Sequence, residues 1–376
     1  MRKSFDNLQA ARGIACLSVV IYHIAIWEAA YGISTPLLRA IRWFGFAGVD
    51  LFFVLSGFII TYAHWDQLGH RHVVPKYLFR RAWRIYPTYL FVLLLTPVLW
   101  HFTLNWPILP AESERHGWSW LTLLPTVAQN PIVPQAWTLT FELLFYIAFV
   151  PLLILPRTCG LLAIASWGLI AGSLAILGQT PNDRVGQFVL SPLVLEFVLG
   201  AMVAVAIRTG YTRFGLWKLC VGFIGIIVGS LVWYLTCDVG EYQISHRGRT
   251  LAFGFAMAII VWGLASLEIH NGSQAPKWLL RIGDASYSIY LVHCSMHPIL
   301  IVYGCAMPHS RLWHMLWLTI ALTSCVGAGL LVHRFVERPA LELVSHRPKR
   351  SVSCFGRIAS HIRSRFRLAS RTYRVK

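Results

Sequence analysis

The chain has 376 residues, of which 56% are hydrophobic and only 13% are charged. Water-soluble globular domains of this length rarely have so apolar a composition, so an ordinary soluble enzyme is excluded and an all-α, polytopic membrane protein is predicted. The formal net charge is +18. No DNA-binding motif and no aromatic platform among basic residues accompanies this charge, so no nucleic-acid partner is expected.

Ten apolar runs are long enough to cross a hydrocarbon core of about 30 Å, which takes about 20 helical residues each. In chain order these predicted spans are 8–27, 41–63, 86–105, 136–156, 159–177, 187–207, 214–236, 248–268, 284–305 and 313–336. Turn residues separate the runs, so we expect short connections and no inserted soluble domain. One longer loop, 106–135, contains WSWLTLLP at 118–125, whose tryptophans suit a short interfacial or re-entrant helix.

Lysine and arginine predict the orientation of the chain. Outside the spans they fall mainly at the N-terminus and in the even-numbered loops, which predicts that both termini are cytoplasmic. We therefore divide the chain into a membrane domain, 1–342, and a basic cytoplasmic tail, 343–376. Residues 345–376 contain no acidic residue, so the tail is expected to bind anionic lipids, either as an amphipathic helix or as a disordered segment.

Ionisable side chains inside the spans are candidates for function, because each costs about 2.5–3.5 kcal/mol on membrane-insertion scales. Those that we single out are Arg12, His23, Asp50, Glu142, Glu196, His293 and His297, together with His333 and Glu337 near the end of the tenth span. The eight cysteines are scattered without the paired spacing of a zinc or redox site, so no metal is expected.

Arg12 and His23 are expected to share one face of the first span. Eleven residues bring a helix within about 20° of whole turns, so the two side chains lie on the same side about 16 Å apart along the axis. Treating each span as a straight rod places Asp50 and Glu142 near the height of His23, toward the outer side. The pattern predicts a face that carries a cation toward the cytoplasmic side of the membrane and a titratable base toward the outer side.

A second basic feature is FRRAWRIYPTY at 79–89, just before the third span. Arginine suits bidentate contact with phosphate. Arg80, Arg81 and Arg84 have two interpretations: they anchor the chain to lipid phosphates, or they join Arg12 in a pocket for a polyanionic cytoplasmic ligand.

Six blocks, in order, resemble a known family. They are LQAARGIACLSVVIYH at 8–23, GVDLFFVLSGFII at 48–60, RRAWRIYPTY at 80–89, WTLTFELLFYI at 137–147, GDASYSIYLVH at 283–293 and VERP at 336–339. With these blocks the chain resembles the membrane acyltransferase 3 family. Its members are bacterial integral-membrane enzymes that O-acylate surface and exported carbohydrates, and the chain is most similar to compact members that modify exopolysaccharides.

The resemblance implies that His23 serves acyl transfer, that Arg12 handles an acyl-CoA donor, and that the basic block containing Arg81 and Arg84 binds this donor. Glu142 matches the first acid of a segment that commonly reads Trp-Ser-Leu followed by paired glutamates. Here Thr138 replaces the serine and Leu143 replaces the second acid, so this chain lacks the second carboxylate of that segment.

The resemblance also implies the reactants and the location. Acetyl-CoA would be the donor substrate with no bound cofactor, and the acceptor would be a carbohydrate or a lipid-linked saccharide. The protein would lie in the bacterial cytoplasmic membrane, where proteins of polysaccharide assembly are possible partners.

Acyl transfer to a hydroxyl needs a base, and a histidine with a pKa near 6.5 suits that role or could itself be acylated and pass the group on. Glu142 or Asp50 is predicted to orient its imidazole. Alternatively, Glu142 is a buried hydrogen-bond hub and Asp50 braces the second span.

Other polar residues are given supporting roles. Tyr287, Tyr290 and His293 are expected to line the substrate cavity, or else to be packing residues of the ninth span. Glu337 suits structural pairing or contact on the donor side. The rival hypothesis is a secondary transporter or flippase, which also needs ionisable residues along a path, although no inverted hydropathy repeat is evident.

Overall fold

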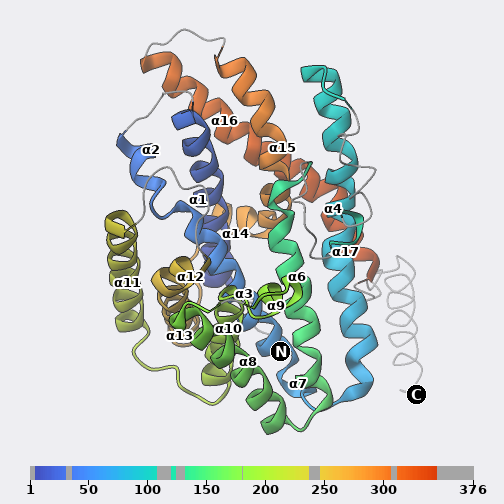
Figure 1. The fold of residues 1–376 in the computed structure, drawn as a ribbon, viewed down its shortest axis with the longest axis vertical. Coiled ribbons are helices and arrows are strands. Elements are labelled where there is room, and N and C mark those ends of the chain that lie inside the picture. Colours follow the sequence, from blue (N-terminus) through green and yellow to red (C-terminus); the bar gives the residue numbers. More distant parts are fainter. Residues whose placement is uncertain are drawn as a thin grey trace, which may run out of the picture.

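The structure is a computed structural model that describes residues 5–30, 36–107, 120–123, 132–179, 181–236, 246–305 and 311–344. Within these ranges the chain is a bundle of helices without strands, as predicted (Figure 1). Half of the predicted loop helix at 118–125 and nearly all of the predicted tail lie outside the described residues.

The α-helices follow the apolar runs of the sequence. They are α1 (Asp6–Ala30), α2 (Pro36–Ile41), α3 (Gly48–His64), α4 (Val74–Leu104), α6 (Trp137–Ala148), α7 (Val150–Ile154), α8 (Arg157–Leu177), α9 (Arg184–Val189), α10 (Leu193–Arg208), α11 (Gly215–Thr236), α12 (His246–Arg249), α13 (Phe255–Asn271), α14 (Lys277–Asp284), α15 (Ser286–Cys305), α16 (Arg311–Val332) and α17 (Arg338–Val344). Two π-helical turns, Thr250–Gly254 and His333–Glu337, lead into α13 and α17.

Nine helical stretches in the described ranges are long and apolar enough to cross a membrane. The ninth predicted span, 284–305, corresponds to the end of α14 and to α15. These two helices are bent by 68° between Asp284 and Ser286, and they make a tenth crossing if the pair counts as one. The multi-pass membrane architecture predicted from composition is therefore confirmed.

The third span differs from its prediction, because α4 begins at Val74 rather than near residue 86. Its 31 residues correspond to about 46 Å of helix, well beyond a hydrocarbon core of about 30 Å. The basic block at 79–89 is therefore helical and continuous with the span, so its side chains project at fixed angles from the side of α4.

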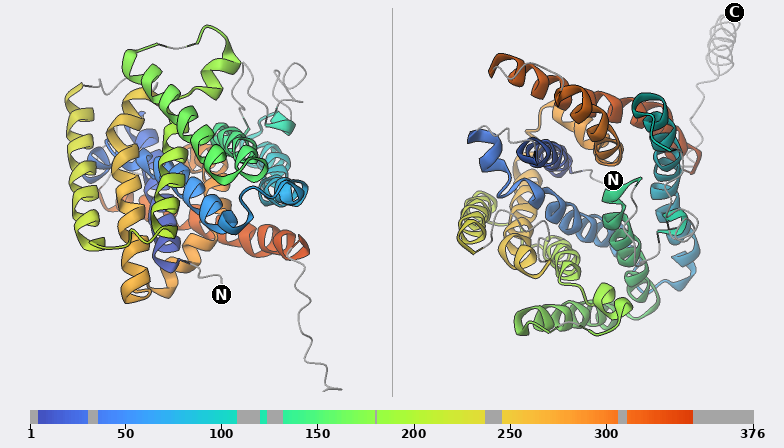
Figure 2. Two further views of the ribbon diagram at one scale, coloured as in Figure 1. Left: turned by 90° about the horizontal axis from the view of Figure 1, so that it is seen from below. Right: turned by 45° about the horizontal axis from the view of Figure 1, so that its top comes forward.

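The helices α1 and α3 lie in the middle of the bundle, with α4, α8 and α11 around the outside (Figure 2). Arg12 on α1 contacts Ser286 at the start of α15, and His23 contacts His293 further along it. α1 and α15 therefore run in the same direction, with the predicted functional face of α1 against α15.

Candidate active site

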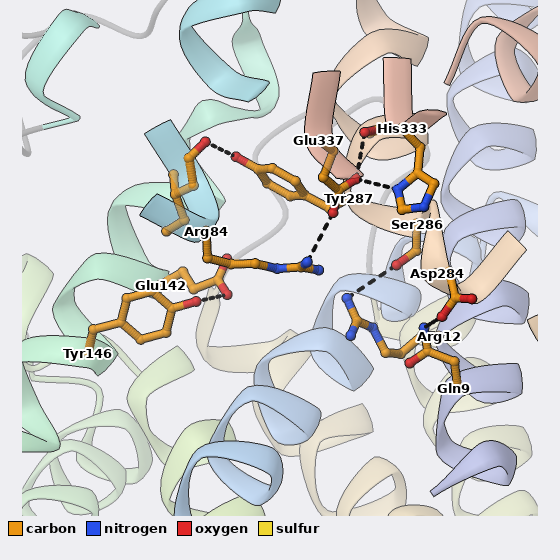
Figure 3. A network of polar contacts seen from close by, with 12 residues as sticks. Gln9, Arg12, Arg84, Glu142, Tyr146, Asp284, Ser286, Tyr287, His333 and Glu337 are labelled. Atoms are coloured by element: carbon orange, nitrogen blue, oxygen red, sulfur yellow. Dashed lines mark hydrogen bonds and ion pairs between the residues drawn. The ribbon is translucent and has the colours of Figure 1, made fainter. Parts of the chain in front are cut away.

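A cavity of about 720 Å³ lies between α1, α3, α4, α6, the start of α15 and the C-terminal α17. Its lining includes Gln9 and Asp284, which are hydrogen-bonded to each other at 2.7 Å, and Thr138 and Tyr290, which are hydrogen-bonded at 3.1 Å. Figure 3 shows how charged and hydrogen-bonding side chains from these helices converge there. The cavity is the place where residues far apart in the sequence form one polar site.

The structure brings Arg12, Arg81 and Arg84 together in the lining of this cavity. Arg12 donates to Ser286 Oγ at 3.3 Å. The Arg81 guanidinium lies 5.7 Å and 5.5 Å from the ring centroids of Tyr77 and Tyr146. Among the described residues, neither Arg12 nor Arg81 forms an ion pair with a carboxylate.

Arg80 does not join this group. Its side chain is exposed and is not among the residues that line the cavity. Successive residues of a helix point about 100° apart, so a helical α4 turns Arg81 and Arg84 toward the bundle and Arg80 away from it. The predicted basic block is thereby divided into two inward cations and one outward cation.

Arg84 is paired with Glu337, which is 1% exposed, at 3.0 Å. The other carboxylate oxygen of Glu337 accepts from Ser288 Oγ at 2.6 Å and lies 2.9 Å from His333 Nδ1 (Figure 3). This matches the structural pairing expected for Glu337. It also connects α4, α15 and the π-helical turn 333–337, so Arg84 has a fixed position at the cavity.

Glu142 lies in the arginine-lined cavity and accepts a hydrogen bond from the Tyr146 hydroxyl at 2.5 Å. The expectation that it lies beside His23 is not met. That expectation placed the start of the fourth span at the outer surface, whereas Val133, Gln135 and Ala136 just before α6 are buried inside the bundle. α6 therefore begins inside the protein, and Glu142 lies deeper than a straight-rod estimate allows.

Asp50 is not beside His23 either. Its carboxylate is fully buried and accepts from Arg249 Nε at 2.8 Å and 2.9 Å, while Arg249 also donates to the Phe46 carbonyl. The sequence gives no local signal for this pair, because Arg249 is 199 residues away along the chain. The contacts support the bracing role for Asp50 rather than the role of an imidazole partner.

His23 belongs to a cluster of three imidazoles on α1 and α15. Its ring centroid lies 5.0 Å from that of His293 and 5.9 Å from that of His297. His23 Nδ1 lies 2.9 Å from the Val19 carbonyl and 3.3 Å from His293 Nε2. Neither ring nitrogen of His297 has a hydrogen-bond partner among the described residues.

Tyr290 lies between the cavity and this histidine cluster. It lines the cavity, accepts from Thr138 Oγ1 at 3.1 Å and has its ring centroid 5.5 Å from that of His293. Tyr287 lies beside Arg84: its hydroxyl donates to the Ile85 carbonyl at 2.7 Å, and its ring centroid lies 5.8 Å from the Arg84 guanidinium. Tyr287 and Tyr290 therefore line the cavity, whereas His293 is behind it.

One group of potential metal ligands was not indicated by the sequence. His23, His293 and Cys294 each bring one ligand atom within 4.8 Å of the others. Imidazole and thiolate together suit soft or borderline ions such as zinc. The sequence spacing did not reveal this group, because His23 comes from a helix far away in the chain.

The fold and the cavity define a polytopic helical membrane protein with a buried, arginine-rich site next to a histidine cluster. The comparison with protein families narrows this class. The acyltransferase domain family matches residues 5–333, and the chain belongs to this family. The resemblance found in the sequence blocks is thereby confirmed, and the protein is an acyltransferase.

Curated relatives match most of the chain. The exopolysaccharide production protein ExoZ of Rhizobium meliloti is 30% identical over 79% of this chain and 90% of its own length. The acyltransferase MdmB of Streptomyces mycarofaciens is 28% identical over 91% of this chain and 92% of its own length. The O-acetyltransferase OatA of Staphylococcus aureus is 25% identical over 89% of this chain, which spans 56% of OatA. No solved structure matches the chain significantly.

Proposed function

We propose that this protein transfers an acyl group, acetyl in the first instance, from cytoplasmic acyl-CoA to a hydroxyl group of an exported or cell-surface carbohydrate. The names of ExoZ, an exopolysaccharide production protein, and OatA, an O-acetyltransferase, support this acceptor class and this acyl group. The cavity supports the donor.

The observation that carries the donor assignment is the pair of cavity guanidiniums, Arg12 and Arg81, that have no carboxylate partner. Both guanidiniums are half-buried, and a cation that is partly withdrawn from water without a direct ion pair is costly, so an anionic ligand that pairs with them binds favourably. The phosphates of CoA supply several negative charges, and guanidinium groups bind phosphate in a bidentate manner. The proposed donor site therefore comprises Arg12 and Arg81, with Arg84 held beside them by Glu337.

His23 would perform the transfer above this donor site. As a general base it takes the proton from the acceptor hydroxyl while the oxygen attacks the thioester carbonyl, and the proton then goes to the departing CoA thiolate. The products are an O-acyl ester and free CoA thiol. A covalent variant, in which the imidazole is acylated first and then passes the acyl group to the hydroxyl, uses the same atoms in two steps.

The proposed orientation places both termini and the donor cavity on the cytoplasmic side of a bacterial inner membrane. The cavity residues Gln9 and Leu341 support this, because they lie near the N-terminal end of α1 and in the last described helix. The basic tail would then face anionic lipids, and proteins that assemble the polysaccharide would be the expected partners.

The proposal is tested with purified protein in liposomes, by measuring CoA thiol release from acetyl-CoA in the presence of saccharide acceptors. We expect His23→Ala to abolish release at unchanged protein abundance. We expect Arg81→Gln to raise KM for acetyl-CoA at least about tenfold, because it removes one phosphate contact of about 1.4 kcal/mol or more. Arg80→Gln, the same change at the exposed neighbour, is the matched control and should leave KM near that of the wild type.

Mass spectrometry of the exported polysaccharides from cells with and without the protein identifies the acceptor. Acyl groups that disappear with the protein support the proposal. Sugar uptake or flipping that does not depend on an acyl donor would instead favour a transporter.

A further inference from the structure

The hydrogen bonds around His23 define which of its ring nitrogens carries the proton. A backbone carbonyl can only accept, so the contact of His23 Nδ1 with the Val19 carbonyl at 2.9 Å requires a proton on Nδ1. In the neutral ring, Nε2 is then left as an unprotonated base. This is the form that takes a proton from a hydroxyl group.

The same reasoning applies to His293, which is fully buried. Its Nδ1 lies 2.6 Å from the Tyr290 carbonyl and therefore donates to it. His293 Nε2 is left with a lone pair, and this atom lies 3.3 Å from His23 Nδ1. The second imidazole thus presents an acceptor to the proton-bearing nitrogen of the first.

In catalytic triads a carboxylate occupies this position, where it holds the imidazole tautomer and stabilises the imidazolium that forms. Among the described residues, no carboxylate oxygen lies within hydrogen-bond distance of the His23 ring. Glu142 and Asp50, the acids expected there, bond to Tyr146 and Arg249 instead. The described acceptors of the Nδ1 proton of His23 are a backbone carbonyl and a neutral imidazole.

We propose that His293 is the positioning residue of His23: it accepts the Nδ1–H through its Nε2 and stabilises the imidazolium that His23 becomes during acyl transfer. His293 remains neutral, and no proton passes to it. This inference rests on the proposed function, because it assigns a partner to the base of that reaction.

The surroundings of His293 suit an acceptor that stays uncharged. The groups that face it are His23 from α1, Tyr290, Cys294 and His297 from α15, and Cys325 from α16, whose Sγ lies 4.0 Å from the His293 carbonyl. None of them is a carboxylate that would compensate a charged imidazole. Among the described residues, the Cys294 thiol, 3.3 Å from His293 Nε2, is the competitor for its lone pair.

Two substitutions separate hydrogen-bond acceptance from mere packing. His293→Leu removes the acceptor, and His293→Gln retains one, since its amide oxygen reaches about as far as Nε2. We expect His293→Leu to lower kcat about 10- to 100-fold, the range for a hydrogen bond to a charged group, with KM for acetyl-CoA unchanged. His293→Gln should recover most of this loss. Cys325→Ala, which alters packing against His293 but leaves Nε2 intact, is the control and should keep the wild-type kcat.

Several results would overturn the assignment. A His293→Leu variant with wild-type kcat would mean that the Val19 carbonyl is a sufficient partner. A His293→Gln variant as impaired as His293→Leu would show that His293 does not act by accepting a hydrogen bond from His23. Stoichiometric zinc in the purified wild-type protein, lost in both variants, would assign His293 Nε2 to a metal with His23 and Cys294.

Nitrogen NMR of histidine-labelled protein tests the geometry without relying on activity. We expect the proton of His23 and of His293 to reside on Nδ1, with the signals assigned by their loss in His23→Ala and His293→Leu. A proton on Nε2 of His293 would contradict the proposal. If wild-type protein releases no CoA, the proposed function fails, while this measurement still decides the pairing of the two imidazoles.

Discussion

Asp50 and Arg249 form an ion pair whose two side chains are almost completely buried, with 0% and 6% of their side-chain surface exposed. Removal of one partner from such a pair leaves a charge without compensation in a poorly solvating interior. The pair connects α3 to α12, and Arg249 also donates to the Phe46 carbonyl just before α3. At the residue scale, Asp50, which was expected to assist His23, instead stabilises the fold.

Asp50→Asn is expected to destabilise the protein by about 3–5 kcal/mol, because Arg249 loses its ion-pair partner. Asp66→Asn is the matched control: Asp66 is 82% exposed, and its carboxylate lies 3.9 Å from Arg208. Such a surface pair contributes at most about 1 kcal/mol. Thermal unfolding in detergent compares the two variants. An Asp50→Asn protein that unfolds like the wild type but releases no CoA would instead indicate that Asp50 takes part in the reaction.

At the scale of elements, close contacts between helices position the site. α3 carries Phe52, Phe53 and Ser56 of the cavity lining, and it packs against α10 without space for side chains at two points. A Cβ atom at Gly57 would overlap the Phe197 carbonyl, and one at Gly200 would overlap the Val54 carbonyl. Small residues commonly permit this approach between membrane helices. The reciprocal glycines therefore determine how near α3 lies to α10.

Gly200→Ala is expected to destabilise the protein by about 1–3 kcal/mol, since the added methyl group meets backbone rather than a movable side chain. Gly327→Ala on α16 is the matched control, because a Cβ there meets nothing within 4 Å. That substitution should be neutral or stabilising by up to about 1 kcal/mol. Thermal unfolding in detergent is again the measurement. Equal unfolding temperatures for the two alanine variants would show that α3 and α10 can separate at little cost.

At the scale of the whole molecule, the site has two parts arranged along α1. The arginine-lined cavity lies around Arg12, and the histidine cluster lies around His23, with Tyr290 between them. The proposed donor site and the proposed base are thus at different depths of one bundle. This arrangement suits a reaction whose donor and acceptor approach from opposite sides of a membrane.

Sealed liposomes test the sidedness of the donor. We expect acetyl-CoA added outside to react only with molecules whose terminal affinity tags are also accessible outside, because the cavity lies at the same end as the start of α1. The rate of CoA release should scale with the fraction of accessible tags, counted by protease digestion before and after detergent is added. If the rate of CoA release scaled instead with the fraction of molecules whose tags are enclosed, the proposed orientation would be wrong.

The sequence alone determined the helical membrane architecture and the shared face of Arg12 and His23. Both depend on local properties: an apolar run of sufficient length partitions into lipid as a helix, and the helical repeat places residues eleven apart on one side. The ordered motifs also identified the acyltransferase family. These features do not depend on which helix lies next to which.

Only the tertiary structure decided which side chains meet. His23 and His293 are 270 residues apart, and Asp50 and Arg249 are 199 apart. A depth estimated from one straight span could not show that α6 begins in the interior or that α4 carries the arginines on its side. Contacts between helices depend on packing, on bends such as that between α14 and α15, and on glycines that permit close approach. The pairing of His23 with an imidazole instead of a carboxylate therefore emerges only when the bundle is assembled.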